Sequence, residues 1–157
     1  MDEHEFHQAL EALNQCPCPF EKAILSGRCA CIKCQHLYIA ERETVACTLP
    51  KAQDRCIELL KQLYQNARFA LKQSDLSSPL SHIKAMKMQC GGLLALQTIL
   101  FSKDASIQPI KDIDALVTKV QEMFGEFEKL PYQEMVKFIS HYQVRHRKGG
   151  GEFKKDT

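Results

Sequence analysis

The sequence of 157 residues contains no tryptophan, and only seven glycines and six prolines interrupt it. These low counts exclude collagen-like and low-complexity chains, which depend on abundant glycine or proline. Long apolar runs are also missing, because the best one, Gly92 to Phe101, falls short of the ~18 residues that span a bilayer. The 45% of apolar residues nevertheless suffices to fill the core of one globular domain without disulfide bonds.

Basic residues are absent from the beginning of the chain. The segment MDEHEFHQALEALNQ contains acidic side chains but no Lys or Arg and no apolar run. Secretory signals and transit peptides have the opposite character, so we expect a cytoplasmic protein. Thiols stay reduced in the cytosol, and clustered cysteines are there more often metal ligands or redox-active groups than structural disulfides.

The net charge of +2 is distributed unevenly. The last thirteen residues, RHRKGGGEFKKDT, contain five basic and two acidic side chains, and the rest of the chain sums to −1. We expect residues 1–147 to form one helical domain that includes a cysteine-rich segment at 16–50, and residues 148–157 to form a basic, disordered tail. Nucleic-acid binding is not expected, because no aromatic residues interleave with these bases and no groove-reading motif accompanies them.

Helical periodicity dominates the hydrophobic pattern. Apolar side chains recur at helical spacing, and proline or serine stands where several of these segments begin. Signals for β-strands are nearly absent, so we predict an all-α fold, an antiparallel helical bundle of four to five helices with an irregular cysteine-rich metal-binding loop near the N-terminus. The expected helices cover residues 3–15, 51–73, 79–101, 110–130 and 132–147, and a short helical turn is expected at residues 20–25.

Eight cysteines are many for a chain of this size, and six of them follow the spacing C-x-C-x10-C-x-C-x2-C-x12-C. Cys16 and Cys18 each precede a proline, which favours an extended backbone and directs both sulfurs to one side. Cys31 and Cys34 stand three residues apart, a spacing that presents both side chains on one face of a turn. The candidate metal ligands are Cys16, Cys18, Cys29, Cys31, Cys34, Cys47, Cys56 and Cys90.

The last two of these cysteines lie on expected helices. Cys56 and Cys90 both fall on apolar faces, so we expect them to point inward toward the cysteine-rich loop. Gly91 and Gly92 follow Cys90, and glycine inside a helix costs about 1 kcal/mol relative to alanine. That cost indicates the close approach of a cofactor or of a crossing helix.

Thiolate-only ligation fits an iron–sulfur cluster or Zn²⁺. Only the pair Cys31 and Cys34 has the spacing typical of a zinc knuckle, so we favour iron–sulfur clusters, of the [4Fe-4S] type, with zinc as the alternative. His36, two residues after Cys34, is a candidate to replace one thiolate. The predicted function is electron transfer or redox sensing with a redox partner protein, and the alternative is a zinc-stabilised interaction module. No catalytic motif is found, and enzymatic activity is not expected.

Overall fold

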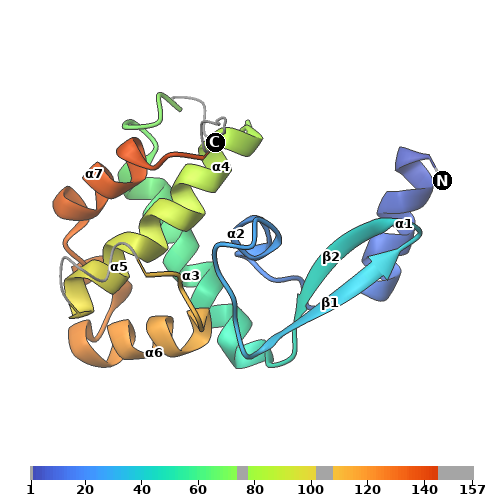
Figure 1. The fold of residues 1–157 in the computed structure, drawn as a ribbon, viewed down its shortest axis with the longest axis horizontal. Coiled ribbons are helices and arrows are strands. Elements are labelled where there is room, and N and C mark those ends of the chain that lie inside the picture. The colour runs from blue at the N-terminus through green and yellow to red at the C-terminus, as the bar shows by residue number, and fades with distance from the viewer. Residues whose placement is uncertain (1, 74–77, 102–107, 145–157) are drawn as a thin grey trace, which may run out of the picture.

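The computed structural model describes residues 2–73, 78–101 and 108–144 of the chain. Within these ranges, helices α3 to α7 gather into one helical body, from which a two-stranded hairpin extends toward α1 at the far end (Figure 1). The helices and strands, in chain order, are α1 (Glu3–Leu13), α2 (Glu21–Leu25), β1 (Cys34–Ile39), β2 (Arg42–Cys47), α3 (Pro50–Ala67), α4 (His82–Met86), a π-helical turn (Lys87–Gly91), α5 (Gly92–Phe101), α6 (Ile113–Phe124), a 3₁₀ turn (Phe127–Lys129) and α7 (Tyr132–His141).

The prediction of an all-α fold is wrong, because part of the cysteine-rich segment forms an antiparallel hairpin. Strands β1 and β2 pair in register from Cys34 opposite Cys47 to Ile39 opposite Arg42. The turn between them includes Ala40 in the left-handed region, at φ 57°. Three consecutive residues of β2 are buried, so the strand lacks the alternation of buried and exposed side chains by which a half-buried strand is recognised.

Helix α1 confirms the helix expected over residues 3–15 but not the burial of its apolar face. Its N-terminus is closed by a capping box between Asp2 and Glu5. No residue of α1 is buried. The helix instead contacts the hairpin through Arg42, whose guanidinium lies 4.3 Å from the centre of the Phe6 ring and pairs with Glu3.

The remaining expected helices are present with shorter bounds. Helix α3 begins at Pro50 and ends at Ala67, because the chain reaches a left-handed residue at Lys72 before the predicted end. Helix α6 ends at Gly125, which has a φ of 81°. In the described residues no helix is long and apolar enough to cross a membrane. The basic tail expected at 148–157 lies outside the described residues.

The helix predicted over residues 79–101 is continuous from His82 but changes its winding at a π-helical turn that contains Cys90. This turn buries Gln89, whose side-chain oxygen accepts a hydrogen bond from the Ala23 backbone N–H at 3.0 Å. The turn thereby joins α2 to the helical body. π-helical turns occur frequently at functional sites, which draws attention to Cys90.

Gly91 and Gly92 are explained by crossing helices. A Cβ atom on Gly91 would lie 2.8 Å from the Ile139 Cα of α7, and one on Gly92 would lie 2.9 Å from the Leu63 Cδ1 of α3. Only glycine lets the α7 backbone come so close to the turn that carries Cys90.

We predict that Gly91→Ala lowers the free energy of unfolding by about 1–3 kcal/mol, because its methyl group meets backbone atoms that cannot rotate away. Gly92→Ala is the matched control, since the Leu63 side chain can move and the helix gains about 1 kcal/mol of intrinsic propensity. Urea denaturation of both variants measures the difference. Equal stability losses would contradict the packing described for Gly91.

Candidate functional site

The cysteine-rich segment adds a third extended piece of chain to the hairpin. The Cys47 N–H donates to the Cys16 carbonyl at 2.7 Å, and the Cys18 N–H donates to the Val45 carbonyl at 3.0 Å. Pro17, which has no N–H to donate, lies between them opposite Ala46. Strand β2 therefore has β1 along one edge and residues 16–18 along the other. The extended backbone expected from the two Cys-Pro junctions is confirmed.

This pairing brings three cysteines into one row. Cys47 lies opposite Cys34 on one side and is hydrogen-bonded to Cys16 on the other. Directly opposed residues of a sheet present their side chains on the same face, about 5 Å apart at Cβ. Cys18 follows Cys16 by two residues and lies on that face as well. Four thiols therefore share one face of the extended segments.

Two further cysteines approach this face. The Cys34 N–H donates to the Cys31 carbonyl at 3.3 Å, which fixes Cys31 in a turn immediately before β1. Cys56 is buried on α3 and lies near enough to Cys18, Cys31 and Cys47 for their charges to act on it. We call this set the six-cysteine group, and it consists of Cys16, Cys18, Cys31, Cys34, Cys47 and Cys56.

Cys18 lies at the centre of the six-cysteine group. The charges of Cys31, Cys47 and Cys34 all act on its thiol. Burial first, and then the charges of these neighbours, raise the pKa of Cys18 to about 12. Burial is also the first cause that raises the pKa of Cys56. A metal centre that binds these sulfurs must therefore displace protons from them.

Backbone N–H groups point at two of the sulfurs. The Phe20 N–H donates a hydrogen bond to the Cys18 sulfur, and the N–H groups of Lys33 and Asp114 donate to the Cys31 sulfur. Each of these bonds favours the thiolate over the thiol and lowers its pKa against the effect of burial. Hydrogen bonds of this kind also adjust the potentials of iron–sulfur centres.

The spacing of the thiols bears on the kind of metal centre they fit. Across residues 2–73, 78–101 and 108–144, no three His, Cys, Asp or Glu side chains are arranged to hold a metal ion. Four thiolates at 2.3 Å from one zinc ion stand only about 3.8 Å apart. Among the described residues, the thiols of the six-cysteine group are thus not arranged around a single ion.

The other two cysteines form a separate pair. The thiols of Cys29 and Cys90 are hydrogen-bonded to each other, and both residues are buried. Cys29 forms an isolated parallel β-bridge with Ile110. The N–H of the next residue, Ala30, donates to the Ile110 carbonyl at 2.9 Å. The inward orientation predicted for Cys56 and Cys90 is confirmed, but the two side chains reach different sets of thiols.

A cavity of about 470 Å³ opens beside this pair. Neither Asp nor Glu lines it, and none of the six-cysteine group does. The lining residues are Gly27, Arg28, Cys29, Cys90, Leu94, Gln108, Pro109, Ile110, Tyr142 and Gln143.

Arg28 connects the cavity to the chain after α7. Its Nη1 donates to the Tyr142 hydroxyl and to the Gln143 carbonyl, each at 2.7 Å, and its Nη2 donates to the Val144 carbonyl at 2.9 Å. All three acceptors are neutral, and Arg28 forms no ion pair with another described residue. The guanidinium is therefore the only charged group among the described residues that line the cavity.

The environment of Cys90 favours its thiolate. The pKa of Cys90 is lowered to about 7, mainly by the hydrogen bond from Cys29. Hydrogen bonds with Tyr142 and Ser26 and the charge of Arg28 also lower it, whereas burial raises it. The same contact with Cys90 raises the pKa of Cys29 well above its usual range. The interaction between the two residues thus raises the pKa of Cys29 and lowers that of Cys90.

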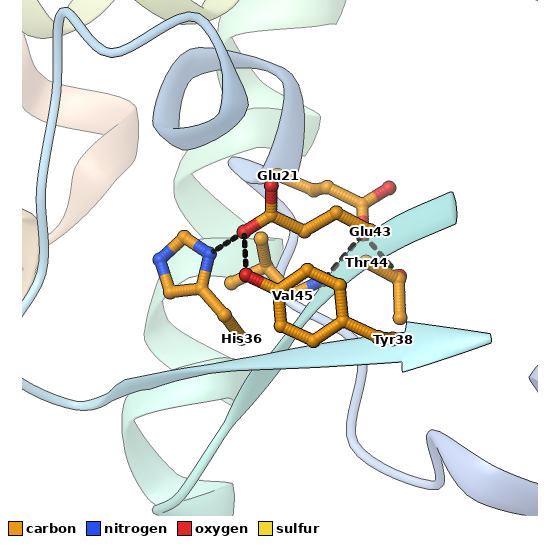
Figure 2. A network of polar contacts seen from close by, with 6 residues as sticks. All are labelled: Glu21, His36, Tyr38, Glu43, Thr44 and Val45. Carbon is orange, nitrogen blue, oxygen red and sulfur yellow. Dashed lines mark hydrogen bonds and ion pairs between the residues drawn. The ribbon is translucent and has the colours of Figure 1, made fainter. Parts of the chain in front are cut away.

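His36 is engaged by a carboxylate. Figure 2 shows its ring Nδ1 bound to Glu43, whose carboxylate also accepts a hydrogen bond from the Tyr38 hydroxyl at 3.4 Å. This pairing provides a role for His36 within the hairpin. The pairing occupies Nδ1 of the His36 ring, and the candidacy of His36 as a metal ligand stays a prediction.

The residues that hold β2 in place were not found from the sequence. Glu21 of α2 accepts hydrogen bonds from the Val45 N–H, at 2.7 Å, and from the Thr44 hydroxyl (Figure 2). The Asn14 side-chain amide donates to the Val45 carbonyl at 3.0 Å. Neither residue stands in a motif, and only their positions relative to β2 in the fold identify them. Tyr142 was missed for the same reason, since it is 114 residues from Arg28.

We predict that Glu21→Ala lowers the free energy of unfolding by about 1–3 kcal/mol, because it leaves the buried Val45 N–H without an acceptor. Glu43→Ala, which removes an exposed carboxylate from the same hairpin, is the control and is expected to cost less. Urea denaturation gives the stabilities, and hydrogen exchange of the Val45 amide locates the change. An unaltered exchange rate at Val45 in Glu21→Ala would contradict this assignment.

Comparison of the chain with protein-family models, with curated proteins and with solved structures finds no match. The two thiol sites are therefore interpreted from the residues of this chain alone.

Proposed function

We propose that the six-cysteine group holds an iron–sulfur cluster and that the protein works in electron transfer or redox sensing with a redox partner protein. The observation that carries this proposal is the convergence of Cys16, Cys34 and Cys47 in one row of extended backbone, with Cys18 beside them. Cys31 and Cys56 complete the set from a turn and from α3. All of these cysteines are free.

The spacing favours a cluster over a single zinc ion. Thiolates that bind one ion crowd around it, whereas those that hold a cluster bind different irons of a larger core and stand farther apart. The described thiols act on one another through their charges, yet no three are arranged around one ion. A core of several irons is therefore the centre that we propose for this group.

Four of the six thiols are the best ligands. Cys18 interacts with the charges of Cys31, Cys34 and Cys47, and these four match the Cys₄ ligation of [4Fe-4S] and [2Fe–2S] clusters. The N–H groups that donate to the sulfurs of Cys18 and Cys31 stabilise thiolates there without adding a charged side chain. When bound, the cluster supplies reversible one-electron chemistry. The chain positions its sulfurs and limits the access of water.

Cys56 and Cys16 differ in position from the four proposed ligands. Cys56 is buried on α3, and its thiol lies within reach of the charges of Cys18, Cys31 and Cys47. We assign Cys56 to the packing of the site on the helical body. Cys16 lies at the outer edge of the row, where its thiol contacts Cys47.

We expect protein purified without oxygen to contain iron and acid-labile sulfide and to show visible absorption that dithionite bleaches reversibly. Cys47→Ser removes the ligand at the centre of the row and should abolish most of the iron and the absorption. Cys90→Ser, outside the group, is the matched control that should retain both. Metal analysis and visible spectra of the three proteins measure the outcome.

The alternative of a zinc-stabilised interaction module gives a different result. Colourless protein with stoichiometric zinc would contradict the cluster and support that alternative. Protein with iron that Cys47→Ser does not remove would contradict the ligand assignment.

A further inference from the structure

We propose that a second cavity, between α3 and α4, binds a small apolar carboxylate such as a medium-chain fatty acid. This cavity has a volume of about 340 Å³, and its lining residues come mainly from α3 on one side and from α4 with the π-helical turn on the other. We call it the α3–α4 cavity. No cysteine lines it, so the proposal is independent of the proposed cluster.

The walls of the α3–α4 cavity are largely apolar. Its volume lies within the range of about 300–1,000 Å³ that is typical of small-molecule sites. Ile57 is 47% exposed although it lines the cavity, so a molecule that binds there can cover apolar surface that now faces water. The apolar lining residues are Pro19, Ile57, Leu60, Leu80, Ala85 and Met88.

Gln89 adds a hydrogen-bond donor to this apolar wall. The residue is only 7% exposed, and its Oε1 accepts a hydrogen bond from the Ala23 N–H at 3.0 Å, which fixes the orientation of the amide. Its Nε2 donates to no other described residue. A nearly buried N–H group without an acceptor is unfavourable, and a bound molecule that carries an acceptor removes this cost. Gln89 belongs to the π-helical turn, and such turns are frequent at functional sites.

Two further groups indicate the chemistry of the acceptor. Lys61 is the only charged side chain among the lining residues, and it forms no ion pair or hydrogen bond with another described residue. The Tyr64 hydroxyl is enclosed and has no hydrogen-bond partner in the described part of the chain. The polar lining groups thus offer donors and a positive charge, and neither Asp nor Glu is among them. A carboxylate supplies acceptors and the opposite charge.

The first test is the binding of octanoate to anaerobically purified full-length protein. Isothermal titration calorimetry should show one octanoate bound per chain. NMR spectra should show shifts of the Ile57, Leu80 and Met88 methyl groups and of the Gln89 side-chain amide. The proposal is overturned if octanoate does not bind, or if the shifts fall on residues outside the α3–α4 cavity.

Ile57→Ala tests the apolar wall. Ile57 and Ile83 are both 47% exposed, but only Ile57 lines the cavity, so Ile83→Ala is the matched control. Ile57→Ala should weaken octanoate binding about threefold to tenfold, because it removes part of the apolar surface that the alkyl chain covers. Ile83→Ala should leave the affinity unchanged. Equal effects of the two variants would speak against this location of the alkyl chain.

Lys61→Gln tests the preference for an acid. Lys51, an exposed residue of the same helix, does not line the cavity, so Lys51→Gln is the matched control. Lys61→Gln should weaken octanoate binding about twofold to fivefold and leave the binding of neutral octanol unchanged, since an exposed ion pair contributes little. Equal affinities of Lys61→Gln and Lys51→Gln for octanoate would exclude Lys61 as the partner of the carboxylate. Octanol binding to the wild type as tightly as octanoate would exclude the choice of an acid.

Circular dichroism verifies that each variant is folded. None of these substitutions touches a cysteine, so the iron and sulfide content of the protein should not change with them. Conversely, loss of the cluster in Cys47→Ser should leave octanoate binding intact. The two proposals therefore fail separately.

Discussion

The pairing of residues 16–18 with β2 is the interaction on which the cysteine site depends. Two backbone hydrogen bonds, one to Cys16 and one from Cys18, fix the register of these residues against the strand. Side chains alternate between the faces of an extended chain, so a slip by one residue would turn both sulfurs away from Cys47. Proline at the position between them is compatible with this edge and prevents a helix from forming there. The convergence of thiols is thus a consequence of backbone register.

Strand β2 is itself held by groups outside the sheet. Glu21 and Asn14 bind the N–H and the carbonyl of Val45, which connects the hairpin to α2 and to the end of α1. The opposite side of the site depends on α3, which begins three residues after β2 and carries Cys56 in its second turn. Only a short connection therefore separates the strand that carries Cys47 from the helix that carries Cys56. The site forms where the hairpin meets the helical body (Figure 1).

The two sets of thiols are neighbours in sequence but have different chemical surroundings. Cys29 and Cys31 flank Ala30, whose N–H and carbonyl are both bound at the entry to α6. Cys29 lies with Cys90 and Arg28 on the wall of the cavity of about 470 Å³, whereas Cys31 joins the six-cysteine group and has a pKa raised by burial. Converging thiols suit a metal centre that replaces their protons.

Sequence patterns predicted what depends on local geometry. The positions of most helices, the extended backbone at the Cys-Pro junctions and the inward orientation of Cys56 and Cys90 follow from periodicity and from the restriction that proline places on the preceding residue. The hairpin was missed because both faces of β2 are covered, which removes the period of two. The division of the cysteines into a group of six and a pair was not predictable, because Cys90 lies 61 residues beyond Cys29 in the sequence. Only the π-helical turn and its close packing on α7 place Cys90 near Cys29. The contacts of Glu21, Arg28 and Tyr142 are equally non-local and leave no motif.

The central proposal is that the six-cysteine group holds a polynuclear cluster and not a single ion. X-ray absorption at the iron edge of anaerobically purified protein tests it most directly, because the scattering beyond the sulfur shell reports whether a second metal atom is present. The account predicts iron surrounded by sulfur, with an iron–iron contribution that disappears in Cys47→Ser. A single metal with a sulfur shell and no metal–metal contribution would contradict it.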